Sequence, residues 1–347
     1  MKRGVLLMAV AGLLFAGCKS DKVVINVYNW GEYISDGTDG TLNVNKKFTE
    51  ETGIKVNYTT FASNEEMYAK IKSNAADYDV IIPSDYMIGR MIEEGMLEKL
   101  NFENIPNASK IDPRFTKREF DPTGEYSVPY TWGTVGIIYN TKKVNEPVDS
   151  WNILWDKKYA DNILMFNNSR DAFAIACKKL GYSLNTTKKE ELLAAAEELK
   201  AQKEVIQAYV MDEIFDKMQN GEAALAPYYA GDAITMIDGN PDLAFSVPKE
   251  GSNVFIDAMC IPKGAKNKEA AEKYIDFLCR PDIAKANIEF LGYSTPQTEV
   301  LEQLDEEVRN NPIIYPPQEV LDRCETMLSL PREAAQEMEN LWIRVKL

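Results

Sequence analysis

The chain has 347 residues, with 39 lysines and arginines, 54 aspartates and glutamates, no histidine, and a formal net charge of −15 at pH 7. A strongly negative surface repels phosphate groups and attracts cationic solutes, so nucleic acid is not expected as a partner. The length allows about two domains, and after the N-terminus no run of ~18 apolar residues is long enough to span a membrane.

The N-terminus has the pattern of an export signal. Lys2 and Arg3 precede an apolar stretch, residues 4–15, that is shorter than the ~20 residues of a spanning helix, and small residues then lead to Cys18. The pattern resembles a bacterial lipoprotein signal, which implies removal of residues 1–17 and a lipid on the Cys18 sulfur that anchors the chain in a membrane leaflet. An ordinary secretory signal with a chance cysteine is the alternative. Both interpretations place the mature chain in the periplasm or at the cell exterior.

Strand and helix patterns alternate from residue 23 onward. The expected strands are 23–28, 54–61 and 79–82. The first expected helix, at 44–51, is stopped by Gly53, and the last helix of this series ends at Gly95. Between them Ser63 and Glu66 form a capping-box pattern at the start of the second helix. This β-α-β-α-β series predicts an open α/β sheet, in which ligands gather at the carboxyl ends of the strands.

The long β-rich segment 127–140 is expected to cross between two lobes. A second α/β series follows it, with helices at 151–158 and 169–180, a helix opened by Thr187 with Glu190 as a capping box, and extended segments at 163–166, 223–229 and 244–247. Segment 254–262 is the expected return crossing, and a helix at 268–279 rejoins the first lobe. Several crossing strands make a hinge rather than a flexible tether.

These elements predict how the chain is divided. The signal covers residues 1–17, the first lobe 18–130 plus 256–298, and the second lobe 131–255 plus 299–347.

Apart from Cys18 the chain has four cysteines, Cys177, Cys260, Cys279 and Cys324. An even number in an exported chain suggests disulfides. The first three lie among small apolar residues, however, so we favour free buried thiols over bridges. Because the chain has no CxxC spacing and no histidine, we expect no zinc site.

Residues 28–33 read Tyr-Asn-Trp-Gly-Glu-Tyr and leave the first strand together. Aromatic faces beside the Glu32 carboxylate favour an ammonium group, and each stacked face contributes roughly 0.5–2 kcal/mol once water is excluded. The other interpretation is an aromatic core cluster with Glu32 in solvent.

Several separated segments, in the same order, make the chain similar to the polyamine-binding proteins, spermidine/putrescine type, of ATP-driven importers. These segments are 28–33, 51–56, 63–70, 83–86, 128–133, 265–268 and 291–296. The resemblance covers nearly the whole mature chain and implies a two-lobed α/β fold, the periplasmic-binding-protein fold of type II, that closes on its ligand by hinge bending. It also implies a monomeric receptor that is not an enzyme, needs no cofactor and hands its ligand to an ABC-type permease.

The resemblance implies a set of ligand-binding positions. They are Trp30, Gly31, Glu32, Tyr33, Ser84, Asp85, Tyr86, Asn168, Asp171, Tyr229, Phe255, Asp257, Tyr293 and Glu325. At four of them the chain departs from the family pattern. Gly31 stands where a hydroxyl residue is common, Asn168 replaces a carboxylate, and Tyr229 and Phe255 stand where tryptophan is frequent. Asp85 and Asp232, beside matched positions, either compensate for Asn168 or are solvated turn residues.

The residue types fit a polyamine ligand even when the family resemblance is set aside. A linear polyamine is a row of ammonium groups separated by methylenes, so its site needs carboxylates along a slot with aromatic walls. Burying a carboxylate without a counter-charge costs several kcal/mol. We therefore expect the cleft to close only with ligand bound, and the preference between putrescine and spermidine stays open.

Three other functions compete with this interpretation. The adjacent Tyr228 and Tyr229 resemble phenolate ligands of ferric ion, although no histidine is available to join them. A receptor for another organic cation, such as thiamine or a betaine, would use the same aromatic walls. A glycoside-cleaving enzyme would use Glu32 and Asp257 set ~5–10 Å apart, but the chain has no nucleophile elbow, P-loop or dinucleotide fingerprint.

Overall fold

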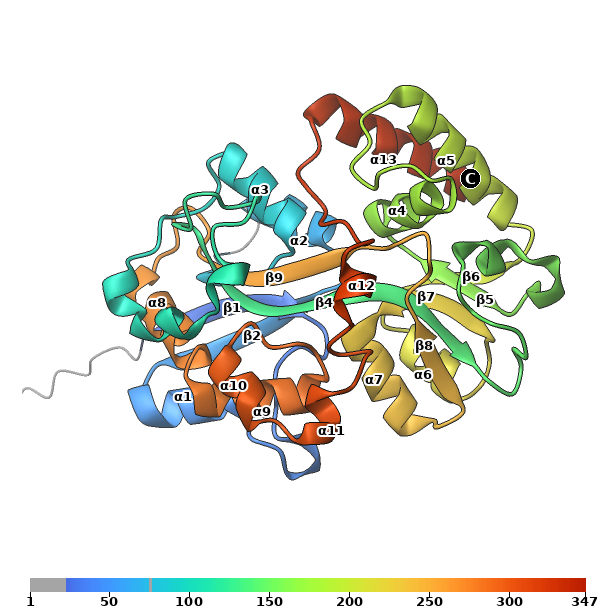
Figure 1. Cartoon of the computed structure of the whole chain (residues 1–347). Coiled ribbons are helices and arrows are strands. Elements are labelled where there is room, and N and C mark those ends of the chain that lie inside the picture. The colour runs from blue at the N-terminus through green and yellow to red at the C-terminus, as the bar shows by residue number, and fades with distance from the viewer. Residues whose placement is uncertain (1–22, 75–76) are drawn as a thin grey trace, which may run out of the picture.

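The computed structural model describes residues 23–74 and 77–347, so the expected signal and Cys18 lie outside the described residues. Two lobes lie side by side and share a sheet of strand order β2-β1-β3-β9-β4-β7-β5-β6, with β8 paired to β4 off this path (Figure 1). We call the part built around β1 to β3 the first lobe and the part built around β5 to β8 the second lobe. The alternation of helices and strands in the sequence therefore correctly predicted an α/β fold.

The first lobe is a parallel sheet covered by helices. Its elements are β1 (Val24–Trp30), β2 (Lys55–Phe61), β3 (Val80–Ile81), α1 (Val44–Thr52), α2 (Asn64–Lys72), α3 (Asp85–Glu93), α8 (Lys268–Leu278), α9 (Pro281–Leu291) and α10 (Thr298–Gln303). β1 pairs in parallel with both β2 and β3. The predicted stop of α1 at Gly53 is confirmed, because this residue takes a φ of 74° that only glycine adopts readily. Ser63 caps α2 by accepting a hydrogen bond from the Glu66 amide at 3.2 Å.

The second lobe repeats the α/β plan. Its elements are β5 (Ile163–Phe166), β6 (Ile206–Val210), β7 (Leu225–Tyr229), β8 (Leu243–Ser246), α4 (Ser169–Lys179), α5 (Lys189–Gln202), α6 (Ile214–Gln219), α7 (Ala230–Gly239) and α13 (Arg332–Lys346). β5 pairs in parallel with β6 and with β7. The carboxyl ends of these parallel strands face the same edge of the sheet, where the first lobe begins.

Two strands join the lobes, as the sequence predicted. The first half of β4 (Ser127–Asn140) pairs with β9 (Val254–Cys260), and its second half pairs with β7 and β8. A third connection follows α10 and carries α11 (Glu306–Arg309) and α12 (Gln318–Leu321), and Figure 1 shows α12 in front of β4 and β9. This connection is tied to the hinge because the Val254 amide donates to the Glu325 carbonyl at 3.0 Å. The boundaries of the lobes given above stay a prediction.

Two local predictions were wrong. The expected helix at 151–158 is instead two short 3-10 helices, because Asp156 accepts a hydrogen bond from the Lys158 amide at 2.8 Å and starts a new turn. The expected capping box at Thr187 is absent, since α5 begins at Lys189 without a side-chain cap.

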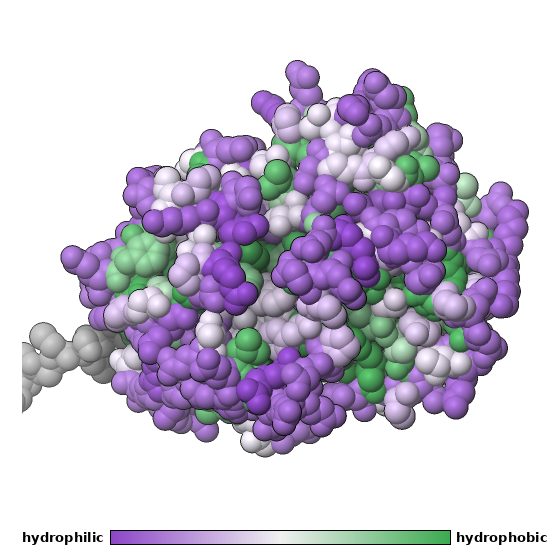
Figure 2. All heavy atoms as spheres, viewed as in Figure 1, coloured by the Kyte–Doolittle hydropathy of each residue, from purple (hydrophilic) through white to green (hydrophobic). Residues whose placement is uncertain are grey.

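Cys177, Cys260 and Cys279 are buried and Cys324 is half-buried, and all four are free thiols. Burial raises the pKa of each of these thiols and so lowers their reactivity. Figure 2 shows hydrophilic residues over most of one face, with smaller apolar patches between them. In residues 23–74 and 77–347, no helix combines the length and the apolar composition needed to cross a membrane.

Candidate functional site

A pocket of about 700 Å³, part of which is open to solvent, lies between the two lobes, beside the hinge strands β4 and β9. Its lining contains the carboxylates of Glu65, Asp85, Asp171, Asp212, Asp232 and Asp257. Its aromatic lining residues are Trp30, Tyr33, Tyr86, Tyr228, Tyr229, Phe255 and Tyr293. Among the described residues that line it there is no lysine or arginine. The cavity is therefore a slot lined by acids and aromatic rings, and we call it the cleft below.

The structure brings together most of the positions that the sequence predicted. All of them line the cleft except Glu32 and Glu325. Glu32 has a φ of 48° and an exposed side chain at the end of β1, outside the lining. Glu325 accepts hydrogen bonds from Lys178 at 2.8 Å and from the Ser183 hydroxyl, on the second-lobe side of the hinge. Both carboxylates are thus placed away from the cavity.

Sequence reasoning missed two acids of the cleft, Glu65 and Asp212. Glu65 lies in the first turn of α2, directly after β2, and Asp212 follows β6. Both come after the carboxyl end of a strand, where an α/β sheet gathers its ligand-binding residues. That position was the signal that could have identified them. Asp232, weighed above only as a compensating charge, lies in the first turn of α7 and also lines the cleft.

Asp257, on β9, is held by first-lobe and hinge residues. The Tyr33 hydroxyl donates to its Oδ2 at 2.6 Å and also hydrogen-bonds to Thr131. Its Oδ1 is buried and accepts no hydrogen bond from the described residues. Burial raises the pKa of Asp257 to about 6, against the opposing effect of the Tyr33 hydrogen bond. A buried acceptor that lacks a donor favours a ligand that brings one.

Asp171, in the first turn of α4, faces the cleft from the second lobe. Its Oδ2 accepts hydrogen bonds from the Tyr229 hydroxyl at 2.7 Å and from the Asn168 amide nitrogen at 2.9 Å. Asn168 also caps α4, since its Oδ1 accepts from the Asp171 amide at 2.8 Å. Asn168 is therefore occupied in orienting Asp171. Burial raises the pKa of Asp171, and the hydrogen bonds from Tyr229 and Asn168 oppose that rise.

Three more acids have pKa values raised chiefly by burial. The pKa of Glu65 is about 7, although it accepts the Tyr86 hydroxyl at 2.9 Å. The pKa of Asp232 is about 8, because burial is reinforced by Asp212, Asp257 and Glu32. Asp85 has both oxygens engaged by backbone amides, those of Tyr86 at 2.7 Å and Ile256 at 3.2 Å, and its pKa is also raised. In each of these acids burial outweighs the neighbouring groups that lower the pKa.

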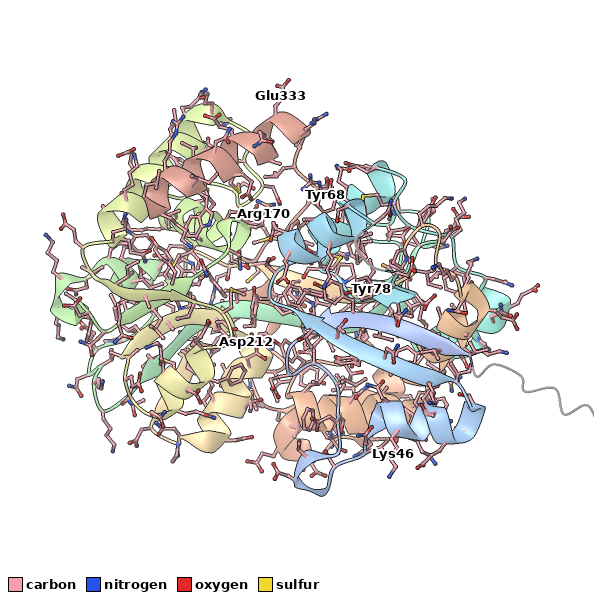
Figure 3. The ribbon with its side chains drawn as sticks, turned by 180° about the vertical axis from the view of Figure 1, so that it is seen from behind. Lys46, Tyr68, Tyr78, Arg170, Asp212 and Glu333 are labelled. Carbon is pink, nitrogen blue, oxygen red and sulfur yellow. The ribbon has the colours of Figure 1, made fainter. Side chains whose placement is uncertain are left out.

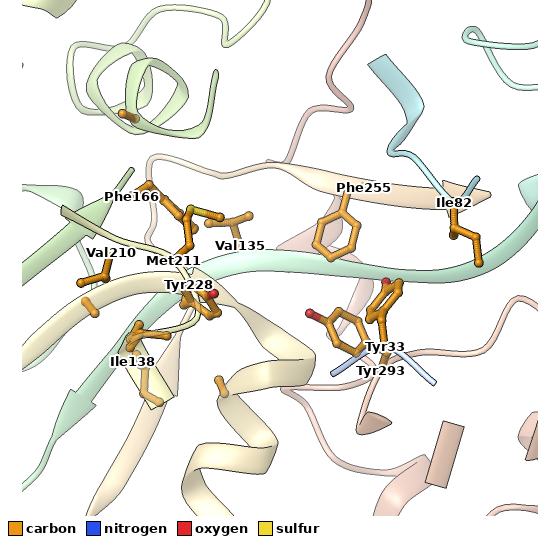
Figure 4. Packing of buried hydrophobic residues seen from close by; sticks show 14 of the residues in the cluster. Tyr33, Ile82, Val135, Ile138, Phe166, Val210, Met211, Tyr228, Phe255 and Tyr293 are labelled. Carbon is orange, nitrogen blue, oxygen red and sulfur yellow. The ribbon is translucent and has the colours of Figure 1, made fainter. Parts of the chain in front are cut away.

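The aromatic rings come from both lobes and from the hinge. The centroids of Tyr33 and Tyr293 lie 5.0 Å apart with the ring planes at 88°, and those of Tyr229 and Phe255 lie 5.6 Å apart at 81°. Figure 4 shows Tyr33, Tyr293 and Phe255 gathered along one stretch of β4. Such edge-to-face contacts hold ring faces available for a cation or for methylene groups.

Chemically, the cleft can hold an elongated cation. Six carboxylates that are costly to ionise together become favourable once ammonium groups lie among them. Tyr228 and Tyr229 do not favour ferric ion, because burial raises the pKa of both phenols well above the ordinary value and the Tyr229 hydroxyl donates a hydrogen bond to Asp171. Within the part of the chain that the structure describes, no group of three histidine, cysteine or acidic residues is arranged to hold a metal ion.

Comparisons with known proteins agree with this geometry. Residues 43–316 match the model of the family described as bacterial extracellular solute-binding protein. The spermidine/putrescine-binding periplasmic protein of Salmonella typhimurium is 37% identical over 324 residues, which cover 92% of this chain and 91% of that one. Among solved structures, a putative spermidine/putrescine ABC transporter from Listeria monocytogenes has 38% identity and a TM-score of 0.89, covering 93% of this chain and 99% of its own. A lipoprotein of Treponema pallidum has 28% identity and a TM-score of 0.81 over 93% and 99%. The predicted two-lobed fold is confirmed.

Proposed function

This chain belongs to the bacterial extracellular solute-binding proteins, and on that premise we propose that it is a receptor for polyamines, spermidine or putrescine, that serves an ABC-type importer. The observation that carries the proposal is the lining of the cleft, which joins six carboxylates to seven aromatic side chains without a basic residue among the described residues. The names of the Salmonella and Listeria relatives support the same ligand class. The family is described as solute-binding, so the chain is a binding component of a transport system and not an enzyme.

The acids divide between the lobes, which gives ligand binding a way to drive closure. Glu65 comes from the first lobe, Asp257 from the hinge, and Asp171 from the second lobe. An ammonium group near each end of the ligand therefore attracts acids of both lobes, and the rings between them contact the methylenes. Because the closed cleft is costly with its acids unneutralised, a cationic ligand stabilises the closed conformation more than the open one.

The protein acts outside the cytoplasm, as an extracellular or periplasmic solute-binding protein. The proposal includes a lipid anchor on Cys18, supported by the signal pattern at residues 1–18 and by the lipoprotein among the similar structures. We also propose that the receptor is a monomer. Expression of the full chain and of Cys18→Ala tests the anchor. The full chain is expected in the membrane fraction and the variant in the soluble fraction, and identical fractionation would contradict the anchor.

Calorimetry on residues 19–347 tests the ligand. Putrescine, cadaverine, spermidine and spermine are titrated beside choline and ferric citrate. Saturable heat with a stoichiometry of one for at least one polyamine, and none for choline or iron, is expected. Binding of choline alone, or a coloured complex with iron and no polyamine heat, would replace the proposed function.

A further inference from the structure

Arg170 is a buried cation next to Asp171 of the cleft, and the function proposed above gives it no role. It lies on α4 of the second lobe, and only 4% of its surface is exposed. Its guanidinium donates to the Leu184 carbonyl at 2.7 Å, to Asn185 Oδ1 at 2.8 Å and to the Leu328 carbonyl at 3.1 Å. Three acceptors therefore fix the group to the second lobe.

The acceptors are themselves held in place. Asn185 donates to the Thr326 carbonyl at 2.8 Å, and its Oδ1 also accepts the Leu328 amide at 2.8 Å. Residues 326–328 continue from the connection that crosses the hinge beside Ser252 and Glu325. The position of the guanidinium is thus set by the second lobe together with the hinge connection.

From this position the guanidinium reaches the first lobe. Its central carbon lies 5.6 Å from the centroid of the Tyr86 ring, within the range of a cation–π contact. Tyr86 belongs to α3, and its hydroxyl donates to Glu65 of α2, so the ring is fixed on the first-lobe side. Figure 3, the view from behind, shows Arg170 on the part of the second lobe that faces the first. The contact joins the lobes directly across the cleft.

The charge of Arg170 acts on acids of both lobes. Asp85 is fully buried at the start of α3, and Asp171 is half-buried beside Arg170 on α4. The guanidinium lowers the pKa of both, against the larger effect of burial. Asp85 belongs to the first lobe and Asp171 to the second, so a fixed cation near both lowers the cost of drawing their negative charges together when the lobes close.

We propose that Arg170 is a positioning residue that links the two lobes across the cleft. As a built-in counter-charge for Asp85 and Asp171, it allows the lobes to close on a ligand with only two ammonium groups. A triamine brings a third ammonium and depends on this built-in charge less. Arg170 therefore sets the selectivity between diamines and triamines. This inference rests on the proposed polyamine function.

The test compares the ratio of putrescine to spermidine affinity in three variants. Arg170→Gln removes the charge, and we expect a loss of roughly tenfold for putrescine and of about threefold for spermidine. Arg170→Lys keeps the charge without the planar fork, so both affinities fall by a similar small factor and the ratio stays within about twofold of wild type. A ratio that changes in Arg170→Lys as much as in Arg170→Gln, or in neither, would overturn the proposal.

Lys179→Gln is the matched control. Lys179 is on the same helix, has 14% of its side chain exposed, pairs with Glu198, and lies 5.0 Å from the Trp155 ring, but it is outside the cleft lining. The variant removes one positive charge and should leave the affinity ratio unchanged. X-ray scattering on each variant reports closure, and the radius of gyration of Arg170→Gln should fall less on adding putrescine than that of wild type.

The effects of each variant on folding and on ligand binding are measured separately. Thermal unfolding of each variant without ligand shows whether the loss of hydrogen bonds at Leu184 and Leu328 has unfolded the chain. If Arg170→Gln does not fold, the uncharged variant Arg170→Met, which keeps a long side chain, takes its place and is expected to give the same change in the affinity ratio. If wild-type protein binds neither polyamine, the proposed function fails. If wild type binds both and Arg170→Gln lowers both affinities equally, only the present inference fails.

Discussion

The carboxylates of the cleft and those of the outer surface differ in the charges around them. Burial would raise the pKa of the surface residue Glu94, but hydrogen bonds from Tyr68, Lys72 and Arg90 lower it to about 2. Inside the cleft, burial raises the pKa of Asp257 to about 6 and that of Glu65 to about 7. The same functional group shifts in opposite directions because burial dominates in the cleft, whose described lining has no lysine or arginine, whereas hydrogen bonds from Lys72 and Arg90 dominate at the surface. The missing positive charge of the cleft is what a polyamine provides.

The contrast between cleft and surface carboxylates is tested most directly by removing the charge of a cleft acid and measuring polyamine affinity. Asp257→Asn or Asp171→Asn should weaken polyamine binding by ~1.5–3 kcal/mol, the range for a hydrogen bond to a charged group. The surface variant Asp112→Asn loses its pairing with Arg114 and should leave affinity unchanged. Calorimetry measures all three, and equal affinities for the cleft and surface variants would contradict the account.

Lowering the pH should weaken polyamine binding. The pKa values of about 6 for Asp257, 7 for Glu65 and 8 for Asp232 lie above the ordinary carboxyl range, so these groups take up protons as the pH falls from 8 to 5.5. Each protonated group removes one attraction for ammonium, and affinity falls by at most about tenfold per pH unit for each group. Binding measured at pH 8 should also release protons, which titration in two buffers of different ionisation enthalpy detects.

Stability without ligand should respond to pH in the opposite way. A carboxyl whose pKa is raised in the folded state binds more protons when folded, so cleft acids make the folded state less stable as pH rises from about 5 to 8. Glu94 and Asp112, with pKa values of about 2, contribute stability above pH ~4 that is lost as the pH falls toward 2. Melting temperatures of the ligand-free protein between pH 5 and 8 test the first part, and a rise with pH would contradict it.

Removing a ring should have a smaller effect than removing a charge. Phe255→Leu or Trp30→Leu removes one aromatic face, which contributes ~0.5–2 kcal/mol to binding a desolvated cation. Phe102→Leu, at an exposed ring outside the cleft, is the control. The order of losses measured by calorimetry should be carboxylate, then cleft ring, then surface ring, and a cleft ring that matters more than Asp257 would reverse the assigned roles.

The smallest effect is expected at Gly31, where the mouth of the cleft meets the surface. A Cβ at this position would lie 2.7 Å from Oδ2 of Asp212, so that carboxylate must shift before the lobes close. Gly31→Ala should weaken binding by about threefold, roughly 0.6 kcal/mol, in the wild-type background. In an Asp212→Ala background the same substitution should cost nothing. An equal loss of affinity in both backgrounds would show that the effect of Gly31→Ala does not depend on Asp212.

Local signals in the sequence predicted much of the fold. The caps at Gly53 and Ser63 and the crossing strands near 127–140 depend on neighbouring residues, and each was located correctly. β6 was not predicted, because the short segment Ile206–Val210 becomes a strand by pairing with β5, more than 40 residues away in the chain. Asp212, which directly follows β6, was missed for the same reason.

The sequence predicted the residue types of the cleft better than the directions of two side chains. Glu32 stands beside Trp30 and Tyr33 in the chain, but its φ of 48° belongs to a turn that the sequence pattern does not reveal. Glu325 pairs with Lys178, 147 residues away, so only the tertiary structure assigns its partner. Asn168 carried a readable local signal, since an asparagine three residues before an acidic residue at a helix start is an N-cap pattern.

The central claim is that the ligand supplies the positive charge that the cleft lacks, and a matched pair of ligands tests it. Residues 19–347 at pH 8 are titrated in a calorimeter with putrescine and with 1,4-butanediol, which has the same carbon chain with hydroxyl groups in place of ammonium groups. The account predicts saturable binding of putrescine with a stoichiometry of one and no measurable binding of the diol. Equal binding of both, or binding of neither putrescine nor spermidine, would contradict it.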